Sequence, residues 1–287
     1  MVVRELASTK LNGLNVKLFE YDINDEQSLS ELKDYLIGKI RKSKVHDIGN
    51  YDLNFYGSKN LNPRFIQKFN EQVAKINVPQ KHKLPQFDVR RSRVTEWMAQ
   101  LLLEKEYNCK FHEEADKRMN IEPIDINKHT PGIDVPGIRI VNNQITFVIC
   151  EVKASEEKKI PCSSVPLLQK DIQKSIDNNE ERVTREILQY MHGIRNIKMR
   201  DEELEKIVGF LAKLIVGTKT ELSKSIMFFP VLIRNNIDIL QNKDPRDYKN
   251  FVVKGIDNKN IENIIFAFGY SIQEFSNEIY TEAICNE

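Results

Sequence analysis

The segment from Pro131 to Lys153 constrains the fold of this chain most strongly, because it predicts a strand that is covered on both faces. It holds two short strand patterns joined by an Asn-Asn pair, and the second strand runs over 144–153. Successive side chains of a strand point to opposite faces, and here both faces are largely apolar. Such a strand is typical of the centre of a sheet with helices on both sides.

The C-terminal end of this strand turns from apolar to charged. Glu151 and Lys153 share one face, and Asp134 lies near the start of the preceding strand. Charged groups at the end of a buried strand cost desolvation energy unless something compensates them. A metal ion shared by the two carboxylates would compensate, with the main-chain carbonyl of Val152 as a further ligand. Oxygen ligands of this kind favour Mg²⁺ or Mn²⁺.

The same groups together could hydrolyse a phosphodiester. A metal ion held by Asp134 and Glu151 can lower the pKa of a bound water and polarise a phosphoryl oxygen. Lys153 points to the same side as Glu151 and can stabilise the charge that develops on the phosphate. The pattern therefore predicts a metal-dependent hydrolase, with Lys153 as its catalytic cation.

The rest of the chain alternates helix and strand patterns, which predicts an α/β fold. We expect an N-terminal α/β region over 1–86 and a second region over 87–287 that contains the charged strand. The apolar strand over 225–234 contains Pro230, which indicates an edge position or a bulge. The remaining elements are expected as strands over 14–22, 52–56 and 264–267, helices over 28–42, from Pro63, 88–107, from Ser163 or Ser164, 183–192, 202–216 and 272–280, and a connector over 77–87.

Three arginines, Arg90, Arg91 and Arg93, crowd the first turn of the helix predicted over 88–107. Cations are unfavourable at the N-terminal end of a helix dipole unless an anion lies nearby. Guanidinium groups suit phosphate, so these arginines are either DNA phosphate contacts or a solvated helix end. His129, five residues before Asp134, is either a further phosphate contact or a turn histidine.

Composition excludes several classes of function. The 43 basic and 42 acidic residues leave a net charge of +1, so any affinity for nucleic acid must come from local clusters or a partner. No apolar run approaches the roughly 20 residues that span a bilayer, and the first residues lack the apolar core of a signal peptide. The absence of a Gly-rich phosphate loop and of a G-x-S-x-G elbow argues against a nucleotide cofactor and a serine hydrolase. The four cysteines lack paired spacing and are expected to be free thiols in a reducing cytoplasm.

Asp134 followed by Glu151-Val152-Lys153 resembles the active-site motif of the PD-(D/E)XK nucleases, although Ile133 rather than proline precedes the aspartate. This resemblance implies a restriction-endonuclease-like core, in which helices flank a central mixed sheet, with an N-terminal α/β extension. It also implies Mg²⁺ or Mn²⁺ as cofactor and places Glu96, on the preceding helix, at the edge of the metal site. Since Glu96 lies roughly opposite the main apolar stripe of that helix, a solvated glutamate is the alternative.

Four longer runs are similar to the HamA nuclease subunits of Hachiman anti-phage defence systems. These runs are VRRSRVTEWMAQLLLE from Val89, PGIDV from Pro131, ICEVKAS from Ile149 and FFPVLIR from Phe228. The similarity implies a bacterial, cytoplasmic DNase controlled by a partner helicase, HamB, which residues 1–86 could bind. Two alternatives stay open: a non-catalytic subunit that keeps a nuclease fold to bind a helicase, and a restriction-type or RNA-cleaving nuclease that acts alone.

Overall fold

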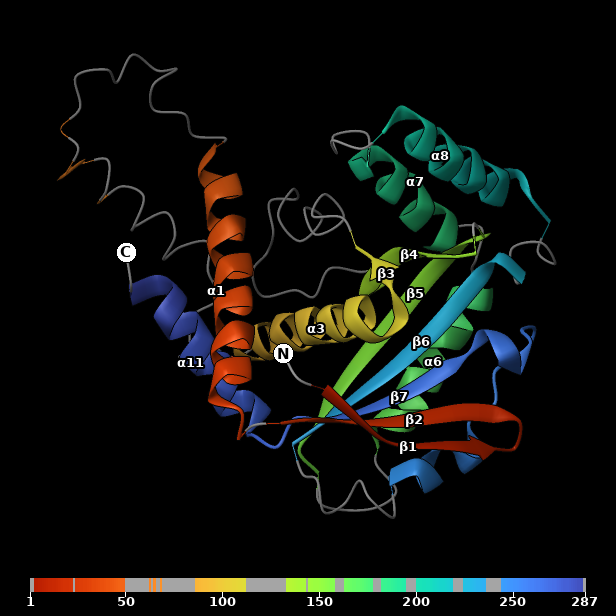
Figure 1. Ribbon diagram of the computed structural model, residues 1–287, viewed down its shortest axis with the longest axis horizontal. Coiled ribbons are helices and arrows are strands. Elements are labelled where there is room, and N and C mark those ends of the chain that lie inside the picture. Colours follow the sequence, from red (N-terminus) through yellow and green to blue (C-terminus); the bar gives the residue numbers. More distant parts are fainter. Residues whose placement is uncertain are drawn as a thin grey trace.

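One mixed sheet of seven strands forms the centre of the computed structural model, in the order β1-β2-β7-β6-β5-β4-β3 (Figure 1). The structure describes residues 3–22, 24–49, 62, 64–65, 68, 86–111, 133–142, 144–157, 163–177, 182–194, 200–218, 224–235 and 244–285. The strands are β1 Val3–Leu11, β2 Leu14–Tyr21, β3 Cys109–Lys110, β4 Val135–Val141, β5 Gln144–Ser155, β6 Ile226–Arg234 and β7 Glu262–Ala267. The sheet flanked by helices confirms the predicted α/β class.

Helices cover both faces of the sheet, as the pattern of the central strand predicts. The first face carries α1 Glu26–Gly49, α3 Gln86–Tyr107 and α11 Ile272–Cys285. The second carries α6 Ser164–Asp177, α7 Arg182–Ile194 and α8 Asp201–Val216, with the short 3-10 helices η2 Asp244–Asn250 and η3 Asn258–Asn260 beyond them. No helix among the described residues is both long and apolar enough to cross a membrane.

Strand β5 contributes to both hydrophobic cores. Val148 and Cys150 pack with α1, α3 and α11, whereas Phe147 and Ile149 pack with α6, α7 and α8. All four side chains are fully buried. Because alternate residues of a strand face opposite sides, one uninterrupted apolar run supplies both cores. This arrangement confirms the predicted central strand.

The predicted hairpin is also confirmed. Strands β4 and β5 pair antiparallel from Val141 opposite Gln144 to Val135 opposite Cys150. The turn between them begins with Asn142, whose φ of 49° lies in the left-handed region that asparagine tolerates. On its other side, β5 pairs in parallel with β6. The hairpin therefore places β5 between an antiparallel and a parallel neighbour.

Both alternatives predicted from Pro230, an edge position and a bulge, are wrong, because β6 lies between β5 and β7 and neither pairing shows a register shift. Its register with β5 is continuous, with Pro230 opposite Glu151. On its other side, β6 forms an isolated bridge from Phe228 to Ile261, and its ladder with β7 starts at Val231. Pro230, which has no N–H to donate, lies in the gap between these pairs, so a central strand accommodates it.

The N-terminal region contains a hairpin that the sequence reading missed. Strand β1 pairs antiparallel with β2 through Asn12 and Gly13, whose φ values are 51° and 83°. An Asn-Gly pair with both φ values positive is the strongest short-range hairpin signal, so the information was present locally. The predicted strand over 14–22 is confirmed as β2.

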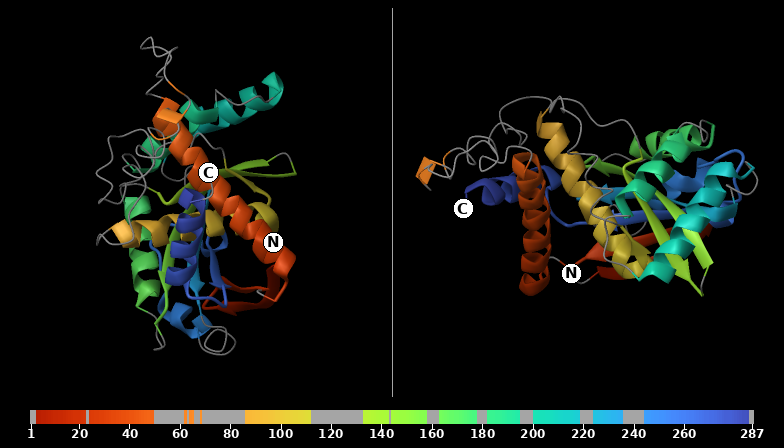
Figure 2. Two further views of the ribbon diagram at one scale, coloured as in Figure 1. Left: turned by 90° about the vertical axis from the view of Figure 1, so that its left-hand side faces the viewer. Right: turned by 90° about the horizontal axis from the view of Figure 1, so that it is seen from above.

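Strand β2 extends the same sheet as the later strands, since it pairs in parallel with β7 from Asn15 to Glu20. Helix α1 packs against α11, and Figure 2 shows the two helices side by side at one end of the molecule. Lys33 of α1 also forms an ion pair with Glu278 of α11, between Nζ and Oε1. The boundary predicted at residue 86 therefore does not separate two sheets, and a partner-binding role for residues 1–86 stays a prediction.

The other predicted helices and strands that fall in the described residues are confirmed, and the largest difference is at the end of α1, which reaches Gly49 where 42 was predicted. They correspond to α1, α3, α6, α7, α8, β6, β7 and α11. The strand predicted over 52–56, most of the helix predicted from Pro63 and most of the connector over 77–87 lie outside the described residues.

Candidate active site

The site forms where β5 continues beyond its antiparallel partner. The ladder with β4 ends at Val135 opposite Cys150, so the following residues of β5 have no β4 residue opposite them. Asp134, immediately before β4, occupies this position, and its Oδ2 accepts a hydrogen bond of 2.7 Å from the backbone N–H of Val152. A carboxylate thereby replaces the backbone acceptor that a longer β4 would have supplied.

The backbone of Val152 directs a second group to the same side. A strand residue in an antiparallel pair presents its N–H and its C=O to the same neighbour. Because the N–H of Val152 meets Asp134, its carbonyl faces the same space. The predicted carbonyl ligand therefore lies on the side of the strand where Asp134 lies.

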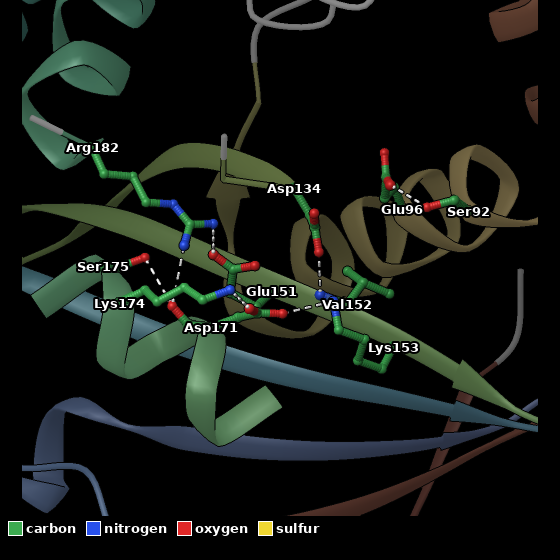
Figure 3. A network of polar contacts seen from close by, with 10 residues as sticks. All are labelled: Ser92, Glu96, Asp134, Glu151, Val152, Lys153, Asp171, Lys174, Ser175 and Arg182. Carbon is green, nitrogen blue, oxygen red and sulfur yellow. Dashed lines mark hydrogen bonds and ion pairs between the residues drawn. The ribbon is translucent and has the colours of Figure 1, made fainter. Parts of the chain in front are cut away.

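Glu151 and Lys153 point to the opposite side of β5 from Cys150 and Val152, toward α6 and α7. The side chain of Glu151 is 1% exposed, and its Oε1 pairs at 2.8 Å with the Nη2 of Arg182, the first residue of α7. The Nζ of Lys153 pairs at 2.9 Å with Oδ2 of Asp171 on α6. Figure 3 shows both pairs beside the end of β5.

A further contact joins these two pairs. Nη1 of Arg182 donates to the backbone carbonyl of Asp171 at 3.3 Å. Lys174, one turn further along α6, forms an ion pair of 2.9 Å with the Oδ1 of Asp171. These contacts connect four residues in the order Lys153, Asp171, Arg182 and Glu151, which we call the charge network.

Sequence reasoning found Glu151 and Lys153 but missed Asp171 and Arg182. Asp171 lies three residues after the buried Leu168 and next to the buried Ile172, at a position of the apolar stripe of α6. An acid at such a position needs a partner, and this is the signal that could have identified it. Arg182 precedes the apolar pattern of α7 and offered no comparable signal.

A metal ion was predicted to compensate the charged side chains at the end of β5, but two of these side chains already have partners in the chain. Glu151 and Lys153 are compensated within the chain by Arg182 and Asp171. Asp134 and Glu96, in contrast, form no ion pair with any cation among the residues that the structure describes. Among the described residues, cations act on these two carboxylates only from a longer distance, Lys153 on both and Arg93 on Glu96.

Glu96 lies on α3, near Asp134, and its Oε1 accepts a hydrogen bond of 2.8 Å from the hydroxyl of Ser92 (Figure 3). Burial and the neighbouring charge of Asp134 raise the pKa of Glu96 to about 8. Burial also raises the pKa of Asp134, although Lys153 and the Val152 N–H act against it. The prediction that Glu96 belongs to the edge of the site agrees with this proximity.

Glu151 and Lys153 also carry shifted pKa values. Burial, followed by the charge of Asp134, raises the pKa of Glu151 well above its ordinary value, and Arg182 opposes this rise. Burial acts to lower the pKa of Lys153, but Asp134 and Asp171 outweigh it and the net shift is upward. Lys153 is therefore held in its ammonium form.

The donor atoms fit a hard divalent cation in type. Asp134, Glu96 and the carbonyl of Val152 offer oxygen ligands, which Mg²⁺ and Mn²⁺ prefer. A cation bound there would also offset the repulsion between the two carboxylates. In the described part of the chain, however, no group of three or more histidine, cysteine, aspartate or glutamate side chains is arranged to hold a metal ion.

The residues predicted to contact DNA phosphate divide into three cases. Arg90 is 3% exposed and its guanidinium lies 4.9 Å from the ring centre of Tyr280, so it packs between α3 and α11. Arg91 and Arg93 are partly exposed on α3, and their role stays a prediction. His129 lies outside the described residues.

The fold and site together define an α/β protein with acids and a lysine gathered at the end of its central strand. No protein-family model matches the chain, and a search of curated proteins finds no match either.

Replacing Glu96 with glutamine is expected to flatten the pH dependence of stability. Between its ordinary pKa of 4.5 and the raised value of about 8, the folded wild-type chain binds more protons than the unfolded chain. The free energy of unfolding should therefore fall as pH rises through this range, and Glu96→Gln should remove part of the slope. Urea denaturation from pH 5 to pH 9 measures it.

The matched control is Glu106→Gln, at an exposed position near the end of the same helix. It should keep the wild-type slope. A residual slope is expected in Glu96→Gln because Asp134 contributes with the same sign. An unchanged slope in Glu96→Gln would show that Glu96 ionises normally.

Proposed function

We propose that the protein is a metal-dependent DNA nuclease of the PD-(D/E)XK type, which hydrolyses phosphodiester bonds. The observation that carries the proposal is the meeting of Asp134, Glu151 and Lys153 at the end of β5, with Asp134 bonded to the N–H of Val152. Three groups separated in the sequence by up to 19 residues are thus gathered at one strand end.

The order of elements supports the same proposal. Helix α3 is followed by β3, β4 and β5, which pair antiparallel in sequence, then by α6 and by β6 parallel to β5. The resemblance to PD-(D/E)XK nucleases implies a helix, then the strands of the motif, then a helix and an apolar strand. In this chain, α7 and α8 are inserted between α6 and β6.

The chemistry is divided among the residues of the site. Asp134, Glu96 and the Val152 carbonyl would hold Mg²⁺ or Mn²⁺, with Glu151 as a further carboxylate. When bound, such an ion supplies an activated water and a polarised phosphoryl oxygen. Lys153, kept as an ammonium, stabilises the negative charge that develops on the phosphate.

We further propose that this nuclease acts in bacterial anti-phage defence, in the cytoplasm, under the control of a helicase. The support is the similarity of four runs to HamA nuclease subunits. A net charge of +1 accords with it, because a helicase partner would supply much of the affinity for DNA.

The non-catalytic alternative is also favoured by one observation. The pairing of Glu151 with Arg182 and of Lys153 with Asp171 stabilises both charges without a metal ion. A subunit that keeps the fold only to bind a helicase could retain such a network. This alternative predicts co-purification with the helicase but neither cleavage nor affinity for Mg²⁺ or Mn²⁺.

The deciding experiment incubates the purified protein with plasmid DNA, single-stranded DNA and RNA, alone and with a candidate partner helicase. We expect DNA cleavage with Mg²⁺ or Mn²⁺, none in EDTA, and recovery when the metal is restored. Cleavage of RNA alone would indicate an RNA-cleaving nuclease. No cleavage under any condition, together with no calorimetric signal for Mn²⁺ binding, would overturn the proposal.

A further inference from the structure

The charge network of Lys153, Asp171, Arg182 and Glu151 connects both charged residues of β5 to the helices that follow it. Arg182 uses two nitrogens of one guanidinium, at 2.8 Å from the Glu151 carboxylate and at 3.3 Å from the Asp171 carbonyl. The planar guanidinium holds these two acceptors in a fixed relation. Arg182 thereby fixes the Glu151 side chain relative to the backbone of α6.

Asp171 restrains the Lys153 side chain in the same way. A lysine ammonium sits on a flexible four-carbon stem and keeps one position only when a partner restrains it. The Oδ2 of Asp171 supplies this restraint at 2.9 Å, and α6 packs directly on β5. The second oxygen of Asp171 is engaged by Lys174, so the carboxylate itself is held from two sides.

We propose, resting on the proposed nuclease function, that Arg182 and Asp171 are positioning residues of the active site. Arg182 fixes the Glu151 carboxylate for metal binding, and Asp171 fixes the Lys153 ammonium for contact with the phosphate. Helices α6 and α7 therefore set the spacing of the two reacting groups, which β5 alone leaves free to move.

The exposure of the four side chains supports a working site over a purely structural network. Glu151 is 1% exposed, whereas the side chains of Arg182, Asp171 and Lys153 are 20%, 18% and 29% exposed. The charge network is thus buried at the Glu151 carboxylate and partly exposed to solvent at the Lys153 ammonium. A phosphate can approach Lys153 while Asp171 still holds it.

The test measures two properties of each variant: Mn²⁺ affinity by calorimetry without DNA, and kcat and KM on a DNA duplex. Arg182→Gln is expected to weaken Mn²⁺ binding about 10-fold to 100-fold, because groups that orient a metal ligand have effects of this size. Arg182→Lys should recover part of that loss. Asp171→Asn is expected to lower kcat by about 10-fold or more, with KM and Mn²⁺ affinity within about 2-fold of wild type.

Two matched controls remove a cation nearby. Lys170→Gln changes an exposed lysine of α6 next to Asp171 in the sequence, and Arg185→Gln changes an exposed arginine one turn further along α7. Both should keep Mn²⁺ affinity and kcat within about 2-fold of wild type, since neither contacts Glu151 or Lys153. If Arg182→Gln does not fold, Asp171→Asn decides the test. This variant is expected to fold, because the Lys153 ammonium that loses its partner is partly exposed to water.

Positioning predicts that Arg182→Gln lowers Mn²⁺ affinity whereas Asp171→Asn lowers kcat. General support of the fold predicts no such division between the two variants. Wild-type values of Mn²⁺ affinity and kcat in folded variants would overturn the inference, as would equal losses of both quantities in both variants. A wild-type protein that neither cleaves DNA nor binds Mn²⁺ would instead overturn the proposed function itself, and the inference with it.

Discussion

Lys153→Ala is expected to abolish DNA cleavage, with kcat lowered by about 100-fold to 1000-fold, while the fold persists. The ammonium group is the only cation that β5 brings to the end where Asp134 and Glu151 meet. Its loss removes the stabilisation of negative charge on the phosphate, which is often the largest single contribution to catalysis. Single-turnover cleavage with saturating Mn²⁺ separates this effect from metal binding.

The fold should survive this change because Lys153 is partly exposed and Asp171 keeps its pair with Lys174. Circular dichroism and the thermal midpoint should therefore stay close to wild type. The matched control is Lys170→Ala, which removes the same charge from an exposed position of α6. A folded Lys153→Ala variant that cleaves DNA within 2-fold of wild type would exclude Lys153 from the chemistry.

The local part of this site could be predicted from the sequence because strands impose a period of two. That period assigns Glu151 and Lys153 to one face of β5 and shows that the strand is buried on both sides. The chain position of Asp134 before a hairpin strand brings it to the same strand end. Each of these conclusions depends on neighbours within one hairpin.

The partners of these residues could not be predicted, because their positions depend on how helices pack. Asp171 and Arg182 lie 20 and 31 residues after Glu151, and only the packing of α6 and α7 on the sheet brings them to β5. The charge of Glu151, for which the sequence predicted a metal ion, is consequently compensated by Arg182. Glu96 shows the same limit, since its helix is buried over most of its circumference and a helical wheel alone does not identify the covered side.

Two errors have a different origin. Proline has no N–H to donate to a neighbouring strand, so Pro230 indicated a strand at the sheet edge. In the structure, Pro230 lies at a gap in the pairing of β6 with β7, where no N–H is needed, although β6 is a central strand. The hairpin at Asn12 and Gly13 carries a strong local signal, since both residues of the Asn-Gly turn have positive φ values. The first case needed tertiary structure, whereas the second needed only the turn chemistry.

Arg182→Ala is expected to lower the free energy of unfolding by about 3–5 kcal/mol, the cost of leaving a buried charge without its partner. Glu151, at 1% exposure, would lose the guanidinium that lies 2.8 Å from its carboxylate. The loss should be larger at pH 9 than at pH 5. The variant removes the group that opposes the raised pKa of Glu151, so protonation of this carboxyl at low pH relieves the unpaired charge. Urea denaturation at both pH values measures the effect.

The double variant Glu151→Gln, Arg182→Ala identifies the cause of this loss. A neutral glutamine does not need a cation, so the second change should recover most of the lost stability if the unpaired charge is responsible. Arg200→Ala, which removes an 89% exposed arginine at 4.0 Å from Glu203, should cost less than about 1 kcal/mol. A double variant as unstable as Arg182→Ala would mean that Arg182 stabilises α7 by packing. The loss of stability would then not come from an unpaired charge on Glu151.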